Sequence, residues 1–383
     1  MPSTVGTGPE ECDIDTAHAV AGIDPHKHTA TIAVVNALGV LITRLSFAVT
    51  ESGVAELLAL LRGTGLVIDR VGVEGSGGLG RPLTLALAAA GYDVREVPAS
   101  RTAERRKRRR RAKTDTEDAE AIARETLSDP GLPPAGKHAT PPASWDTLVA
   151  IRDWRESLVL QRKRLLNEAE PVLVSLPLPV REQLPTNSRV RSALKRLSTL
   201  GPTLTGLDAA DRIKLARLAA TLTEVSSIDG NIKALDRQIP ALLADLGCTL
   251  TDIHGIGVVT AMTLLTEVGD PHRFTREGQF ARWCGAAPIP VSSGEGDGPA
   301  HRHRLDLGGN RQVNSVLHIV HVTQARCHPP ARTYLARREA EKKTTREARR
   351  AHKRQLANVI IRHMWNDADH LARRPKPTKI HAA

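Results

Sequence analysis

The sequence predicts a chain with an α/β domain near its N-terminus and a mostly α-helical remainder. Short segments rich in Val, Ile and Thr, separated by turn residues, fill residues 18–97 and indicate strands. From residue 146 onward, apolar residues recur at helical spacing. Apolar residues make up 40% of the 383 positions, which is enough to form a core in each of two or three domains.

The elements of the N-terminal domain follow a definite order. Strands are expected at 18–24, 29–36, 40–49, 66–74 and 92–98, and helices at 51–62 and 78–91. Three strands at hairpin spacing, followed by helix, strand, helix and strand, give the order of an RNase H-like sheet. We therefore expect an RNase H-like α/β domain at residues 18–130, after a disordered tail at 1–17.

Four further segments follow this domain. Prolines mark a linker at 131–145, a helical or coiled-coil connector fills 146–248, a compact domain fills 249–365, and a basic disordered tail ends the chain at 366–383. A heptad-like apolar seam in the connector comprises Val225, Ile228, Ile232, Leu235, Ile239, Leu242 and Leu246. It fits an intramolecular helical hairpin as well as a dimer contact. Pro171, Pro240 and Gly230 argue against long straight helices.

The charge of the chain is concentrated in two places. The net charge is +12, but residues 101–113 alone carry +8 and residues 337–383 carry +9. Such runs indicate a polyanionic partner, although a solvated tail is the ordinary alternative. No apolar run is long enough to span a membrane, no signal peptide is recognisable, and the four cysteines are scattered. These features predict a cytoplasmic protein with no membrane partner.

Four carboxylates stand where a metal site would need them. Asp24 and Glu74 each end an apolar strand segment, and Asp115 and Asp118 share one face of the helix expected after them. Taken singly, each fits a turn or helix-cap role. Clustered carboxylates repel one another unless a cation neutralises them, and Mg²⁺ or Mn²⁺ prefers such oxygen ligands. We predict a divalent metal site at these four acids.

Three segments carry a family resemblance. GIDPHKHTATIAVV, GVEGSGG and AKTDTEDAEAIA resemble the motifs of DEDD-type transposases of the insertion-sequence-110 family, whose catalytic domain is RuvC-like. The resemblance implies that Asp24, Glu74, Asp115 and Asp118 are the catalytic acids. His26 and His28 follow Asp24, and we interpret His26 as a packing or phosphate-contact residue because Mg²⁺ favours oxygen.

The resemblance continues in the C-terminal domain. Gly-Ile-Gly before an apolar helix, a helix-hairpin-helix-like element, is followed by Gly-x-x-Pro, Ser-Gly and Gly-Asn-Arg elements of the family's transposase domain. The family's nucleophilic serine matches Ser293, with the adjacent Ser292 as the alternative. Basic residues expected to contact nucleic acid are Arg105, Arg106, Lys107, Arg108, Arg109, Arg110, Arg111, Lys113, Arg302, Arg304 and Arg311.

The resemblance implies a transposase of a bacterial insertion sequence that cleaves and exchanges DNA strands beside the nucleoid. It further implies an element-encoded guide RNA and a homo-oligomer, a dimer or tetramer. Three alternatives stay open at this point. The chain could be a site-specific DNA invertase of the related Piv type. It could also be a metal-dependent junction nuclease without a covalent intermediate, or a nucleic-acid-binding protein with an inactive nuclease fold.

Overall fold

A computed structural model describes residues 18–98, 115–137, 143–185, 189–201, 204–291, 302–305 and 309–373 of the chain. The chain divides into two compact units, residues 1–141 and 142–383, which are described separately. Within the described residues, no helix combines the length and the apolar character that crossing a membrane requires.

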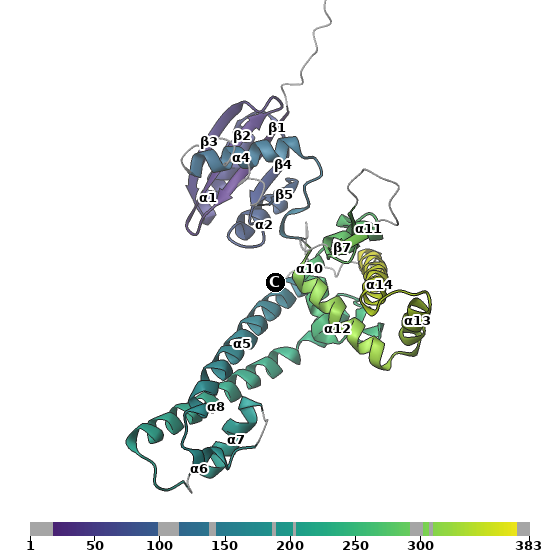
Figure 1. Cartoon of the computed structure of the whole chain (residues 1–383). Coiled ribbons are helices and arrows are strands. Elements are labelled where there is room, and N and C mark those ends of the chain that lie inside the picture. Colours follow the sequence, from purple (N-terminus) through teal and green to yellow (C-terminus); the bar gives the residue numbers. More distant parts are fainter. Residues whose placement is uncertain are drawn as a thin grey trace, which may run out of the picture. The chain divides into compact units, whose positions relative to one another are not determined.

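The first unit is a five-stranded mixed sheet with helices on both faces (Figure 1). Its strands are β1 (His18–Pro25), β2 (Thr29–Asn36), β3 (Leu41–Ala48), β4 (Val67–Glu74) and β5 (Val94–Val97), and its helices are α1 (Glu51–Gly63), α2 (Arg81–Ala89) and α4 (Asp115–Ser128). The order across the sheet is β3-β2-β1-β4-β5, with β4 parallel to β1 and to β5, and β2 antiparallel to its neighbours. The predicted elements and their order are confirmed.

Side chains that alternate along the central strands form two separate cores. On one face, Ile23 and Val73 pack with Leu57 of α1 and Leu83 of α2. On the other face, Val20 packs with apolar residues of α4. Both faces of β1 are therefore covered, as expected for a strand that is almost continuously apolar.

The expected linker at 131–145 is partly ordered onto the sheet. Pro134 forms an isolated bridge with Arg95 of β5, and Ala135 is buried. The first helix of the second unit, α5, begins at Ala143, inside the expected linker. The prolines therefore mark the change of unit but do not make the whole segment a spacer.

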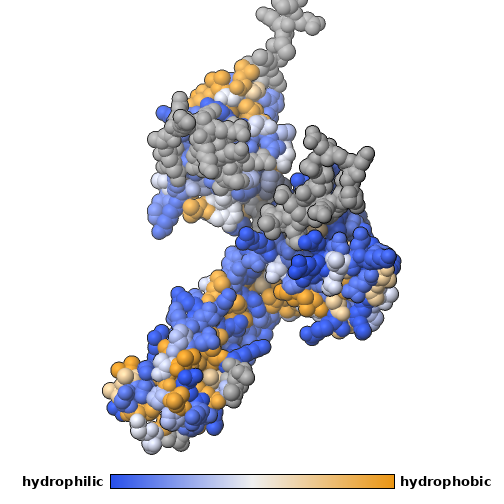
Figure 2. Space-filling model, viewed as in Figure 1, coloured by the Kyte–Doolittle hydropathy of each residue, from blue (hydrophilic) through white to orange (hydrophobic). Residues whose placement is uncertain are grey.

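The second unit contains a long helical hairpin. α5 (Ala143–Val174) and α8 (Ala209–Asp236) run antiparallel, because Arg155 pairs with Asp236 while Arg162, seven residues later, pairs with Asp229, seven residues earlier. The short helices α6 (Leu178–Arg181) and α7 (Val190–Leu200) pack near the turn of this hairpin (Figure 1). Apolar patches interrupt the hydrophilic surface there (Figure 2).

Of the three interruptions expected from Pro and Gly, only the one at Pro240 is confirmed, because α8 ends at Asp236 and a new helix begins at Ile239. α8 passes through Gly230, and Pro171 lies only three residues before the end of α5. Pro240 lies in the first turn of α9 (Ile239–Asp245), where a missing N–H costs nothing. Seam residues such as Ile232 and Leu235 are buried in one core with α5, so they pack within the chain.

The expected boundary at residue 248 does not separate two cores. One buried cluster joins Leu148 and Ile151 of α5 to residues of α10 (Val258–Val268), α11 (Glu277–Trp283), α12 (Arg311–Cys327) and α14 (Thr345–Arg373). The helix α13 (Pro329–Ala340) packs against α12 and α14, and two short strands, β6 (Pro288–Val291) and β7 (Arg302–Leu305), form an antiparallel hairpin.

The prediction that a disordered tail begins at residue 366 is wrong for its first eight residues, because α14 continues to Arg373. Asp367 is buried, and its carboxylate accepts hydrogen bonds from the backbone amide (2.8 Å) and hydroxyl (2.7 Å) of Thr249. A charged residue thus holds the end of the helix onto the core. Residues 374–383 lie outside the described part of the chain.

A buried histidine pair joins α12 to α14. The Nδ1 atoms of His321 and His352 are 3.1 Å apart, so one neutral ring must donate and the other accept. Burial, reinforced by His352 and nearby cationic side chains, lowers the pKa of His321 to about 4. The pKa of His352 is also lowered, mainly by burial.

This pair predicts a loss of stability at mildly acidic pH. The unfolded chain takes up a proton near the ordinary histidine pKa of about 6.5, whereas folded His321 resists it until about pH 4. The free energy of unfolding should therefore be unaffected by His321 above pH 7 and should fall by up to about 3 kcal/mol between pH 6.5 and 4. Urea unfolding at pH 7 and 5 should show a smaller drop for His321→Gln; an equal drop would contradict the assignment.

Candidate active site

Asp24 and Glu74 lie side by side at one edge of the sheet. β1 and β4 are parallel neighbours, and Ile23 is in register with Val73, so the next residues along the two strands are the two acids. Residues in register on adjacent strands point to the same face of a sheet. The sequence predicted that each acid ends a strand; the register adds that the two ends are adjacent.

Two glycines show which face the acids share. A methyl group on Gly22 would lie 2.1 Å from the backbone nitrogen of Ala123, and one on Gly72 would lie 1.8 Å from Oγ1 of Thr126. Both partners belong to α4, so positions 22 and 72 face that helix. Because side chains alternate along a strand, Asp24 and Glu74, two residues later, face the same side.

The direction of α4 brings its first turn toward the two acids. Val20 packs with Ala123, whereas Gly22 faces Ala123 and Ala119, so α4 runs antiparallel to β1. From Gly22 to Asp24, β1 advances by about 6.6 Å, and four residues of a helix advance by about 6 Å. Four residues before Ala119 is the first turn of α4, so Asp24 lies opposite that turn. That turn holds Asp118, which is 5% exposed, and Asp115. The side chain of Asp115 is outside the described part of the structure.

The neighbourhood of the two strand-end acids is also organised. The Nε2 atom of His26 is 3.4 Å from Oδ2 of Asp24, whose side chain is 14% exposed. The backbone amides of Gly75 (3.2 Å) and Ser76 (3.0 Å) donate to the carboxylate of Glu96 on β5, which also binds the Ser76 hydroxyl. Glu96 therefore fixes the turn directly after Glu74. The sequence does not single out Glu96, because nothing in its local pattern distinguishes it from other acids.

The donor set suits a hard divalent cation. Carboxylate oxygens are the ligands that Mg²⁺ and Mn²⁺ prefer. Asp24 and Glu74 share one edge of the sheet, and Asp118 lies in the first turn of the helix that covers this face. Among the described side chains, no three His, Cys, Asp or Glu residues already converge on a single point. The fourth expected ligand, Asp115, is not among those side chains.

The remaining predicted residues are placed only in part. Arg105 to Arg111, Lys113, Ser292 and Ser293 lie outside the described residues. Arg302 and Arg304 belong to β7, paired with Val291 and Ile289 of β6, but their side chains are not described. Arg311 begins α12 and is exposed. The Gly255–Gly257 turn lies directly before α10.

The close packing of α4 on Gly22 gives a stability prediction. Gly22→Ala should destabilise the first unit by about 2 kcal/mol or more, because the added methyl would overlap backbone atoms of α4. It should also displace the helix that carries Asp115 and Asp118. Thermal unfolding would measure the loss, with Gly63→Ala as the control because no atom lies within 4 Å of a methyl group there. Equal melting temperatures for both variants would show that α4 does not approach β1 this closely.

Comparisons with known proteins show which sequences this chain resembles. A family model described as "Transposase" and defined for DEDD transposases of IS110 matches residues 21–176. A second, described as "Transposase IS116/IS110/IS902 family", matches residues 248–336. The insertion element IS110 uncharacterized 43.6 kDa protein of Streptomyces coelicolor is 33% identical over 128 residues. That alignment covers 33% of this chain and 31% of the relative.

Proposed function

Because this chain belongs to the IS110 family of DEDD insertion-sequence transposases, we propose that it cleaves and exchanges DNA strands at the ends of such an element. The observation that carries the proposal is the adjacency of Asp24 and Glu74 on parallel strands, facing the helix that begins with Asp115 and Asp118. A phosphodiester is an anion and would be repelled by a cluster of carboxylates. The four acids can therefore act on DNA only if a cation lies between them and the phosphate.

The four acids would hold Mg²⁺ or Mn²⁺, with His26 and Glu96 in supporting roles. The metal would supply neutralisation of phosphate charge and activation of the attacking oxygen. His26 lies beside Asp24 and would orient its carboxylate. Glu96 would hold the backbone of Gly75 and Ser76 in place when the Glu74 carboxylate binds the metal.

Ser293 is the proposed nucleophile, with Ser292 as the alternative. The two serines follow β6 directly, and Arg302, Arg304 and Arg311 come after them. A serine hydroxyl attacks phosphorus only when its proton is removed and the phosphate charge is balanced. Basic residues around the hairpin would hold the flanking phosphates. A guide RNA encoded by the element and assembly into a dimer or tetramer belong to the same proposal.

The test is strand cleavage and rejoining by the purified full chain on DNA that carries an element end. Activity should require Mg²⁺ or Mn²⁺ and should disappear with EDTA. Joined products with a protein-linked intermediate support the recombinase. Cleavage without joining or linkage supports the junction nuclease, and inversion without excision supports the invertase. Binding without any cleavage, at every metal concentration and with RNA added, would overturn the enzyme proposal.

The arginine run predicts salt-dependent binding. Neutralising Arg105 to Arg111 should weaken nucleic-acid binding across sequences and reduce the slope of log affinity against log salt by several units, at about 0.9 per lost phosphate contact. Fluorescence anisotropy on duplexes of unrelated sequence, from low to high salt, would measure it. The wild type and the variant should converge at high salt. Parallel salt curves would mean that the run does not contact phosphates.

A further inference from the structure

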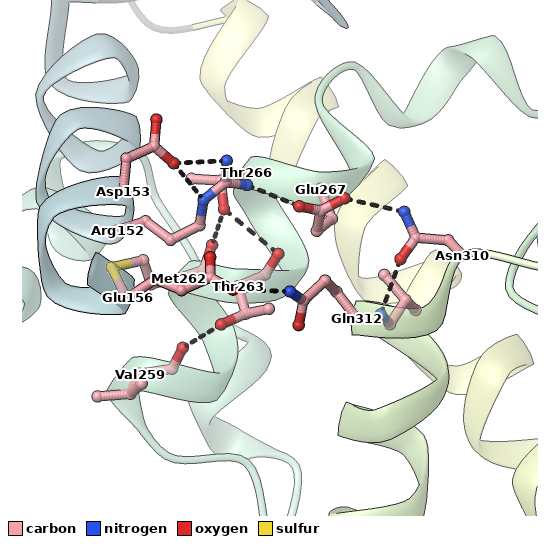
Figure 3. Close-up of polar contacts among 11 residues, drawn as sticks. Arg152, Asp153, Glu156, Val259, Met262, Thr263, Thr266, Glu267, Asn310 and Gln312 are labelled. Carbon is pink, nitrogen blue, oxygen red and sulfur yellow. Dashed lines mark hydrogen bonds and ion pairs between the residues drawn. The ribbon is translucent and has the colours of Figure 1, made fainter. Parts of the chain in front are cut away.

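Glu267, near the end of α10, is the centre of a polar cluster in the second unit (Figure 3). Its Oε1 atom is 2.8 Å from Nη1 of Arg152 on α5, and its Oε2 atom accepts a 2.8 Å hydrogen bond from the side-chain amide of Asn310. The side chains of Glu267 and Arg152 are only 15% and 18% exposed. A carboxylate this shielded from water, with both oxygens engaged, constrains both partners.

Asn310 is held in place by hydrogen bonds at the start of α12. Its side-chain oxygen accepts a hydrogen bond from the amide of Val313 (2.9 Å) and so caps α12. Its backbone amide donates to the carbonyl oxygen of Trp283 at 2.8 Å. The side-chain amide, the side-chain oxygen and the backbone N–H of Asn310 thus each form a hydrogen bond, and together they fix its position.

The two ends of the β6–β7 hairpin meet at this point. A methyl group on Gly309 would lie 2.3 Å from the backbone nitrogen of Gly285, so these backbones are in contact. Asn314 donates to the carbonyl oxygens of Cys284 (2.8 Å) and Gly285 (3.2 Å) and accepts from Lys353 (2.6 Å). Gly285, before β6, and Gly309, after β7, therefore form the base of the hairpin. Ser292 and Ser293 lie between these two residues in the sequence.

The same cluster connects this base to α5, one of the two helices of the α5–α8 hairpin. Arg152 is braced by Asp153, and Glu156, one turn later, accepts a 2.9 Å hydrogen bond from Gln312 of α12. α5 therefore contacts the start of α12 directly through Glu156 and indirectly through Glu267 (Figure 3). These side chains therefore link α5 to the base of the β6–β7 hairpin.

From these contacts we infer that Glu267 is a positioning residue that ties the base of the β6–β7 hairpin to α5, and that the rate of the serine chemistry depends on this connection. The inference rests on the proposed serine chemistry. Glutamine has the shape of glutamate but only one accepting oxygen, and its amide nitrogen would face a donor. Glu267→Gln would therefore leave either Arg152 or Asn310 without its acceptor.

The experiment compares four variants of the full chain: Glu267→Gln, Arg152→Gln, Arg152→Lys and, as the control, Glu168→Gln. Glu168 forms an exposed pair with Arg164 on α5, far along the helix from this cluster. Single-turnover formation of the serine–DNA adduct should fall on the order of 10²-fold in Glu267→Gln and Arg152→Gln, while DNA affinity stays unchanged. Arg152→Lys, which keeps a cation for Oε1, should recover most of the rate.

Hydrogen exchange separates this inference from the proposed function. Amides of residues 302–305 and 310–314 should exchange faster in Glu267→Gln and Arg152→Gln than in the wild type and Glu168→Gln. If the wild type forms no adduct, the serine mechanism fails while the exchange difference remains. An adduct rate and exchange pattern equal to the wild type in Glu267→Gln would overturn the positioning role. If Glu267→Gln does not fold, the contrast between Arg152→Gln and Arg152→Lys decides.

Discussion

Asp24→Asn should reduce divalent-metal-dependent DNA cleavage by about 10³-fold or more, which corresponds to about 4 kcal/mol in the barrier. Asparagine keeps the size of the side chain but removes the negative charge that would hold the cation. Asp118→Asn should have an effect of the same order, because Asp118 lies in the helical turn that faces Asp24. Gel-based cleavage under single-turnover conditions would measure both rates.

The matched control is Asp69→Asn. Asp69 is also on β4, but it lies near the opposite end of the strand, is 43% exposed, and pairs with His18. The same chemical change there should leave cleavage within about two-fold of the wild type, because a surface ion pair contributes little. Loss of activity in this control would indicate damage to the sheet and would remove the support that Asp24→Asn gives to the site.

Metal binding can be measured independently of DNA cleavage, by thermal unfolding. Mn²⁺ or Mg²⁺ that binds the folded state alone should raise the melting temperature of the wild type in a concentration-dependent way. Asp24→Asn and Asp118→Asn should lose this shift, and without metal they should be at least as stable as the wild type, because one of several repelling charges is gone. Wild-type melting that is insensitive to both ions would argue against the metal site even if cleavage were lost.

The sequence predicted the first unit well because its signals are local. Each strand is short and β-branched, and the order of strands and helices restricts the sheet to few topologies. The strand-end positions of Asp24 and Glu74 followed from the apolar runs before them. Their common face did not, because it depends on the register of β1 with β4 and on where α4 crosses the sheet.

Contacts between distant residues explain what the sequence did not predict. Glu96 supports the turn after Glu74 from the neighbouring strand, and Glu267 joins Arg152 to Asn310 across more than 100 residues of chain. Neither acid lies in a periodic pattern. The end of α14 was assigned to a tail because its residues are polar, although Asp367 is buried against Thr249. The composition of this segment shows that it is polar, but it does not show that Asp367 is buried by contact with a residue far away in the sequence.

Ser293→Ala should abolish the covalent protein–DNA adduct while leaving nucleic-acid affinity nearly unchanged. Alanine removes the attacking oxygen but none of the basic residues that would hold the phosphates. Joining should fall by orders of magnitude with it, because strand exchange would need the energy of the broken phosphodiester to be kept in the serine linkage. A nicked or suicide substrate traps the adduct, and mass spectrometry of the linked peptide identifies the residue.

Each outcome of this experiment separates two mechanisms. An adduct that maps to Ser292 keeps the serine mechanism and moves the nucleophile by one residue. An adduct lost in Ser293→Ala, but still formed by Glu168→Gln, supports Ser293 as the nucleophile, because the latter change lies on the helical hairpin. If Ser293→Ala and Ser292→Ala each cleave and rejoin DNA at the wild-type rate, neither hydroxyl attacks phosphorus. Water at the carboxylate-bound metal would then be the nucleophile, as in a junction nuclease, and strand joining would need another explanation.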